Sequence, residues 1–213
     1  SADYYPKLQP SQFLTGPAEG WQYFHGVWAP AYEGIRVVER GRGPFALWGG
    51  AKFKDGAIEA NVTLPGAVEL AGILFRASAA GDGARGYEVV FDPRKQQLSL
   101  RRNGDQSSPL AEAEMKMSAR EVVRLRIECD GPRIKVIVND SPLMEMTDKE
   151  AGIVEGSVGV RAWGGSLWLD GLTIRSPGGG NTVVPSGEPA PAYRALQSLC
   201  LMLFNLNEFI YVD

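Results

Sequence analysis

Short runs of alternating apolar and polar residues dominate the chain, and they predict β-strands rather than helices. In the run 57–64 every second residue is apolar: Ile58, Ala60, Val62 and Leu64. The runs 122–129 and 133–138 alternate in the same way, and Asp130-Gly131-Pro132 forms a turn signal between them. Roughly a dozen such runs, with no helix between them, predict an all-β fold in which two antiparallel sheets pack as a β-sandwich.

The residues 71–78, 87–92 and 97–102 predict three consecutive antiparallel strands in the middle of the chain. Alternation with period two places Arg76 and Glu88 on the same sheet face, among apolar neighbours. Opposite charges on a half-apolar face indicate either a structural ion pair or a polar ligand site, and the pattern leaves both interpretations open.

The chain changes character after the last predicted strand. We expect a β-sandwich over 1–176, a flexible linker rich in Gly and Pro over 177–192, and a helical tail over 193–213. Apolar residues recur at helical spacing in 193–207, namely Leu196, Leu199, Cys200, Leu203 and Phe204. This helix is apolar on nearly every side and too short to span a membrane. We therefore expect it to pack against the sandwich, a partner chain or another part of a larger domain.

Composition narrows the classes of function. The chain has 213 residues, 44% of them hydrophobic and 22% charged, and a formal net charge of −3 without any basic block, which argues against nucleic-acid binding. The two cysteines, Cys129 and Cys200, make neither a disulfide framework nor a metal motif, so we expect each to be a small buried side chain. His25 is the one histidine, which excludes a zinc site of several histidines, and a Ser-His-Asp triad would lack a recognisable nucleophile elbow.

Five motifs in 21–175 resemble the concanavalin A-like lectin and glucanase superfamily: Phe53–Val62, Ala71–Arg76, Gly86–Asp92, Leu125–Gly131 and Gly156–Leu172. Within that superfamily the chain is similar to family-66 carbohydrate-binding modules, which bind fructans, and to the domain of 3-keto-disaccharide hydrolases. The resemblance implies a jelly-roll sandwich and a glycan partner.

The resemblance also implies a site near the middle strands. In the family-66-like pattern an arginine that ends one strand and polar residues of the next strand lie near the ligand. The corresponding residues here are Arg76, Tyr87 and Glu88. Sugars combine apolar C–H faces with hydroxyl groups, so such sites pair an aromatic platform with charged hydrogen-bonding groups.

Further residues complete this expected site. Trp163, before the predicted hairpin turn Gly164-Gly165, could supply the platform, and three residues could rim the site: Glu69, Asp82 and Arg85. The structural alternative stays open for each, with Arg76 and Glu88 as a cross-strand pair and Trp163 in hairpin packing. We expect the remaining tryptophans to lie in the core: Trp21, Trp28, Trp48 and Trp168.

A second resemblance covers the end of the chain. The residues 195–213 are similar to the C-terminal signature of large planctomycete-type multidomain proteins of unknown function. This resemblance implies that the chain is the tail end of a longer exported polypeptide, located in the periplasm, at the cell surface or outside the cell. The helix 193–207 would then contact a partner domain or a second copy of the chain.

Three functions remain open, and the resemblance favours a non-catalytic carbohydrate-binding module of a larger exported protein. The first alternative is a structural or protein-interaction domain that uses the apolar helix. The second alternative is a glycoside hydrolase, which requires two carboxylates about 5–10 Å apart. The candidates for them are Glu69, Glu88, Asp92 and Glu155. No cofactor is certain. Asp170 matches a position that holds structural calcium in some sandwiches, but no EF-hand-like loop accompanies it.

Overall fold

The computed structural model describes residues 18–25, 27–31, 34–39, 43–64, 70–104, 108–150, 152–163, 167–185, 195–196, 198–200 and 202. These residues contain fifteen strands. The first eight are β1 (Trp21–Phe24), β2 (Val27–Ala31), β3 (Gly34–Glu39), β4 (Phe45–Phe53), β5 (Gly56–Thr63), β6 (Leu70–Ala80), β7 (Gly83–Asp92) and β8 (Gln97–Asn103). The others are β9 (Ser108–Glu114), β10 (Val122–Asp130), β11 (Arg133–Val138), β12 (Ser141–Thr147), β13 (Gly156–Trp163), β14 (Trp168–Arg175) and β15 (Asn181–Val183).

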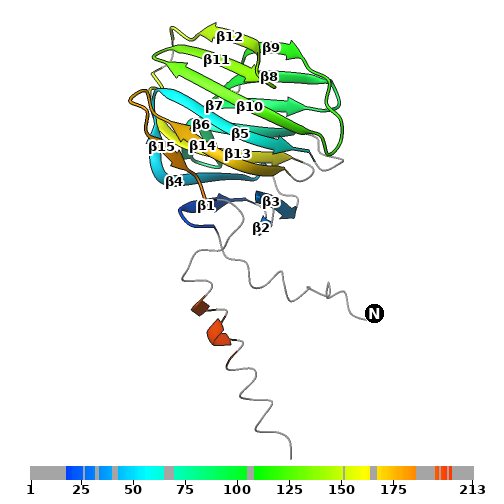
Figure 1. Cartoon of the computed structure of the whole chain (residues 1–213), viewed down its shortest axis with the longest axis vertical. Helices are drawn as coiled ribbons and strands as arrows, with labels where there is room; N and C mark the ends of the chain where they lie inside the picture. The colour runs from blue at the N-terminus through cyan, green and yellow to red at the C-terminus, as the bar shows by residue number, and fades with distance from the viewer. Residues whose placement is uncertain are drawn as a thin grey trace, which may run out of the picture.

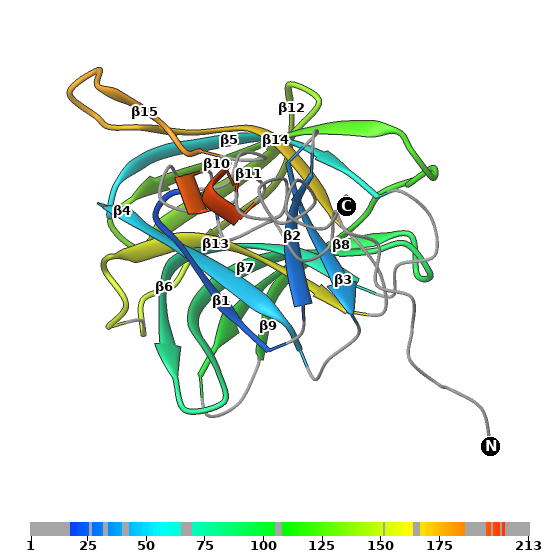
Figure 2. The same cartoon turned by 90° about the horizontal axis from the view of Figure 1, so that it is seen from below.

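The strands form two stacked antiparallel sheets (Figure 1). One sheet has seven strands in the order β1-β4-β13-β6-β7-β8-β9, and the other has six in the order β12-β11-β10-β5-β14-β15. The strands β2 and β3 form a separate two-stranded ribbon, which Figures 1 and 2 place beside β1, outside the two main sheets. The predicted all-β, two-sheet sandwich is therefore confirmed.

The core lies between the two sheets, and β5 shows how the sequence pattern produces it. Ile58, Ala60 and Val62 point inward and are at most 5% exposed, whereas Glu59 and Asn61 between them are only half-buried. The neighbouring strand β10 buries Leu125 and Ile127 in the same layer. Burial of each large aliphatic side chain contributes about 1.5–3 kcal/mol to the free energy of unfolding, so this alternation accounts for the sandwich.

The sandwich extends into the stretch that the sequence assigns to a linker. After β14 the chain turns back, with Gly179 at a φ of 87° and its amide donating to the carbonyl oxygen of Ser176, and the strand β15 then pairs with β14. Val184 is 1% exposed, and the indole N–H of Trp21 donates to the carbonyl oxygen of Pro185 at 2.6 Å. The Gly-rich segment thus forms a hairpin, because glycine adopts the positive φ that the turn requires.

Several predictions fall on residues outside those described, namely Glu69, the Gly164-Gly165 turn, 186–194 and most of the tail. In the tail, residues 195, 196, 198–200 and 202 are helical. Three of their apolar side chains are more than half exposed: Leu196, Leu199 and Met202. Among the described residues, no helix has the length and apolar character needed to cross a membrane.

Candidate functional site

The outer face of the seven-stranded sheet carries a group of charged, polar and aromatic side chains. We name it the outer-face cluster, and its members are Phe45, Gly72, Glu88, Asn103, Arg161 and Trp163. Strand alternation places these residues there. On β13, Val160 and Ala162 point into the core at 1% exposure each, so Arg161 and Trp163 point to the opposite face.

A buried ion pair forms the centre of the outer-face cluster. The Nη1 atom of Arg161 donates to Oε2 of Glu88 at 3.2 Å, and Nδ2 of Asn103 donates to the same oxygen at 2.5 Å. Glu88 is 2% exposed and Arg161 8% exposed, so both charges are removed from water. Removing a charge from water is costly, and the pairing with its hydrogen bonds offsets only part of that cost.

Burial also changes the protonation of this carboxyl group. Desolvation raises the pKa of Glu88, while the positive charge of Arg161, the hydrogen bond from Asn103 and the charge of Arg101 oppose that rise. Carboxyl groups with raised pKa values in charged surroundings are typical of functional sites, although structural ion pairs show them too.

Two aromatic rings flank the guanidinium group of Arg161. Its Cζ lies 5.7 Å from the ring centre of Phe45 and 5.3 Å from that of Trp163. Its Nε is buried and has no hydrogen-bond partner within the part of the chain that the structure describes. An unpaired buried donor costs about 1–3 kcal/mol, so a ligand that accepted this hydrogen bond would recover that free energy. The cluster therefore combines a free donor, a carboxylate and two rings.

Comparison with known proteins now identifies the fold family. Residues 16–175 match the model of the family described as 3-keto-alpha-glucoside-1,2-lyase-like domains. The chain belongs to this family. A search of curated protein sequences finds no match to this lyase-like domain.

Solved structures share the architecture of the lyase-like domain. The carbohydrate-binding module CBM66 from Bacillus subtilis is 22% identical, has a TM-score of 0.64, and the match covers 73% of this chain and 94% of the module. A Bacillus subtilis protein of unknown function with a galectin-like fold is 12% identical (TM-score 0.59; coverage 83% and 95%). The Ca²⁺- and mannose-bound exoplasmic/lumenal domain of VIP36 is also 12% identical (TM-score 0.52; coverage 80% and 91%). The expected concanavalin A-like fold is thus confirmed.

Arg76 does not lie in the outer-face cluster of the lyase-like domain, and it does not pair with Glu88. A β-bulge in β6 shifts the register between Phe75 and Ser78, and Arg76 adopts a φ of 47° there. The bulge turns the side chain toward the end of the sandwich. There it donates to the carbonyl oxygens of Lys54 (2.8 Å) and Gly131 (2.8 Å) and to Oδ1 of Asp55 (3.0 Å). It thus joins the β4–β5 turn, which connects the two sheets, to the β10–β11 turn of the six-stranded sheet.

Tyr87 also has a structural position rather than the expected place beside a ligand. Its ring is fully buried in the core and stacks on Phe75 with the ring centres 5.4 Å apart. Its hydroxyl donates to Oδ2 of Asp148 at 3.1 Å. Burial, followed by the nearby Asp148 carboxylate, raises the pKa of Tyr87 to about 12.

The remaining expected residues divide between surface and structure. Asp82 and Arg85 are exposed around the β6–β7 turn and form no hydrogen bond or ion pair among the described residues. Of the hydrolase carboxylates, Glu155 is exposed, and Asp92 accepts the backbone N–H groups of Arg94 and Lys95 at 3.1 and 3.0 Å. Of the expected site residues, Glu88 and Trp163 lie near each other, because both contact the guanidinium group of Arg161.

Among the described residues, no cluster of calcium ligands surrounds Asp170. Asp170 is exposed and lies opposite Asn61 on the neighbouring strand β5. Within the described ranges, no group of three or more His, Cys, Asp or Glu side chains is placed to hold a metal ion.

Sequence reasoning missed Phe45, Asn103 and Arg161. The signal for Arg161 was present, because it lies between two small apolar residues and shares a strand face with Trp163. Its proximity to Glu88 depends on the strand order β13-β6-β7, and period-two alternation carries no information about that order.

Proposed function

We propose that this domain binds a glycan at the outer-face cluster. The observation that carries the proposal is the buried Nε of Arg161, which lacks a partner among the described residues and lies between the rings of Phe45 and Trp163. The half-buried indole of Trp163 offers a surface for the apolar face of a sugar ring. Beneath this surface lie a donor, the Arg161 guanidinium, and an acceptor, the Glu88 carboxylate; because they are only 8% and 2% exposed, their side chains would have to move toward the ligand to bind its hydroxyl groups.

The comparisons support the same ligand class. The family is named for action on 3-keto-α-glucosides, one structural relative is a carbohydrate-binding module, and another is described in a mannose-bound form. We infer that the role is binding without catalysis, as expected for a module attached to a larger exported protein. The exoplasmic/lumenal origin of the VIP36 domain supports a location outside the cytoplasm.

Elimination from a 3-keto-α-glucoside is a second candidate, favoured by the raised pKa of Glu88 and by the family name. A ketone at C3 acidifies the proton on C2. A base that removes this proton leaves its electron pair to form the C1=C2 double bond, while the C1–O bond breaks and the leaving alcohol takes up a proton. The Glu88 carboxylate would accept the C2 proton, and a carboxyl group with a raised pKa is suited to that step.

A glycan-array screen followed by calorimetry tests the binding proposal. Trp163→Ala should weaken binding of the best glycan at least tenfold, whereas Val183→Ala, at a side chain that is 70% exposed, should leave it unchanged. Arg76→Ala is unsuitable for this purpose, because Arg76 joins two turns and its loss would disturb the fold. Equal affinity in the Trp163 and Val183 variants would overturn the proposed site.

The elimination candidate has its own readout. The product carries a C=C bond conjugated to the C3 carbonyl, so its ultraviolet absorbance reports turnover of a methyl 3-keto-α-glucoside. Glycan binding with no rise in absorbance would support the non-catalytic role. A rise that Glu88→Gln abolishes would support elimination, and a rise that persists in Glu88→Gln would exclude Glu88 as the base.

A further inference from the structure

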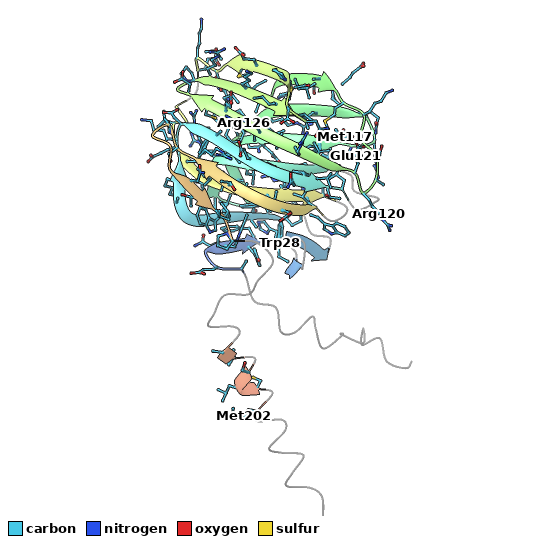
Figure 3. The ribbon with its side chains drawn as sticks, in the orientation of Figure 1. Trp28, Met117, Arg120, Glu121, Arg126 and Met202 are labelled. Carbon is cyan, nitrogen blue, oxygen red and sulfur yellow. The ribbon has the colours of Figure 1, made fainter. Side chains whose placement is uncertain are left out.

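The outer face of the six-stranded sheet, on the opposite side of the sandwich from the outer-face cluster, carries a hollow of about 400 Å³. We name it the Trp168 hollow, and the residues that line it are Asn61, Thr63, Arg120, Val122, Trp168 and Asp170. Arg120 lies near one end of the sandwich, well away from Arg126 on β10 (Figure 3).

Strand register builds an apolar row in this hollow. Thr63 on β5 lies opposite Trp168 on β14 and also opposite Val122 on β10, so the three side chains lie side by side across three strands. Their neighbours Val62, Val123 and Leu169 point into the core. Trp168 is half-buried and Val122 is 54% exposed, which leaves an indole and an isopropyl group open on the surface.

A polar row follows two residues further along the same strands. Asn61 lies opposite Asp170 and also opposite Arg124. Nη2 of Arg124 forms an ion pair with Oδ2 of Asp140 at 2.7 Å. Within the described ranges, the side chains of Asn61, Asp170 and Arg120 form no hydrogen bond or ion pair. The hollow therefore has an apolar strip beside free carboxylate, amide and guanidinium groups.

Elsewhere on this face several charges are paired, although Asp130 on β10 and Lys135 on β11 form no ion pair within the described ranges. Glu59 accepts from Arg126 at 2.6 Å and from Arg175 at 2.7 Å, and Arg126 also contacts Glu128 at 2.8 Å. Three groups without a partner, those of Asn61, Arg120 and Asp170, line the same hollow as the half-buried indole of Trp168. The combination of an indole with donors and acceptors in one hollow is what distinguishes it from the paired region around Glu59.

The tryptophan side chains show the same contrast. The indole N–H groups of Trp21, Trp28 and Trp48 each donate to a backbone carbonyl oxygen, as expected for core residues. In the part of the chain that the structure describes, the indole N–H groups of Trp163 and Trp168 have no acceptor. Trp163 belongs to the outer-face cluster, which leaves Trp168 as a second indole with a free donor.

We propose that the Trp168 hollow is a second binding surface for a glucosyl ring of an oligosaccharide. The ring would place its C–H face on the apolar row and its hydroxyl groups against Asp170, Asn61 and Arg120. This inference rests on the proposed glycan-binding function for the choice of ligand, while the residues are separate from those of the outer-face cluster. Two surfaces on opposite faces allow one domain to contact two chains of a polysaccharide, or two segments of one chain.

Titration of the full chain with maltopentaose, followed by the indole ¹H–¹⁵N resonances in NMR spectra, tests both sites at once. Trp163→Phe and Trp168→Phe assign the two signals. Movement of the Trp168 signal supports this inference, whether or not the Trp163 signal moves. Movement of the Trp163 signal alone supports the outer-face cluster and overturns the second surface. The highest maltopentaose concentration should be about 10 mM, which is about a hundredfold above a Kd of 0.1 mM. If neither signal moves at that concentration, both proposals fail for this glucan.

A pair of variants examines the polar row. Asp170→Ala should raise the dissociation constant obtained from the Trp168 signal at least fivefold. The dissociation constant obtained from the Trp163 signal should not change. Glu145→Ala is the matched control, because it removes a carboxylate from β12 of the same sheet, where Glu145 pairs with Arg133 at 2.7 Å. Unchanged affinity in Asp170→Ala, or an equal loss in both variants, would overturn the assignment.

Discussion

Glu88 on β7 and Arg161 on β13 form a buried ion pair, although β6 runs between their two strands. The pair forms across β6 because Gly72, the residue opposite Arg161, has no side chain. A Cβ at this glycine would collide with Oε1 of Glu88. The missing side chain of β6 is thus what allows the two charges to meet, and the outer-face cluster depends on it.

Gly72→Ala should therefore disrupt the ion pair. Extra volume in a packed site costs about 1–3 kcal/mol, and here the displaced group is a charged one, so we expect a loss of unfolding free energy in that range. Urea denaturation measures it. The control is Gly83→Ala, because a Cβ at Gly83 meets nothing within 4 Å. If both variants lost the same free energy of unfolding, the Gly72 gap would have no special role.

The pH dependence of stability should report Glu88. Burial raises the pKa of this carboxyl group in the folded state above its unfolded value. The folded protein then binds the proton more tightly, so this contribution to stability is complete below the unfolded pKa, about 4.3, and is lost as the pH rises through the folded value. Glu88→Gln carries no titrating carboxyl group, so its unfolding free energy should lack this decline.

Denaturation curves for both proteins at several pH values above 4 give the measurement. The difference in unfolding free energy, wild type minus Glu88→Gln, should decrease with rising pH. A difference that stays constant or grows would show that Arg161 and Asn103 outweigh burial and hold the folded pKa at or below its unfolded value.

The fold could be predicted from the sequence because alternation and burial are local properties. Each residue of β5 and β10 falls on the face that its position in the alternating pattern predicts, and the sheets follow from that. The hairpin that carries β15 was missed, because Gly and Pro residues are as common in hairpin turns as in linkers. Val184 in this stretch is buried by residues that are distant in the sequence, and composition does not report such contacts.

The candidate site could be predicted only in part from the sequence. Glu88 and Trp163 were expected near a ligand, and both lie in the outer-face cluster. Arg76 was expected there as well, but a single bulge residue reverses the face to which its side chain points. Period-two reasoning assumes an unbroken ladder, and no feature of Phe-Arg-Ala-Ser in the sequence marks where it breaks.

Arg76 should behave as a structural residue when it is replaced. Its guanidinium is 2% exposed and holds two carbonyl oxygens and the Asp55 carboxylate, so Arg76→Ala should lower the unfolding free energy by about 3 kcal/mol. Arg124→Ala is the matched control. The Arg124–Asp140 pair is more than 60% exposed on both sides, so its loss should cost less than about 1 kcal/mol. Similar losses in chemical denaturation would contradict the structural role of Arg76.

The two cysteines should differ in reactivity toward a thiol reagent. Burial raises the pKa of Cys129 to about 12, and its side chain is 4% exposed, whereas Cys200 is only half-buried in the tail. The thiolate is the reactive form, and at pH 8 a thiol with that pKa is ionised in about one molecule in ten thousand.

Labelling with Ellman's reagent at pH 8 should therefore show one fast thiol in the native protein and a second only in denaturant. Cys200→Ser should abolish the fast phase, and Cys129→Ser should leave it unchanged. Since Cys129 lies in the core, its labelling rate in Cys200→Ser should follow the unfolding equilibrium and rise when Arg76→Ala is added. Fast labelling of Cys129 in the native single variant would mean that β10 opens locally without global unfolding.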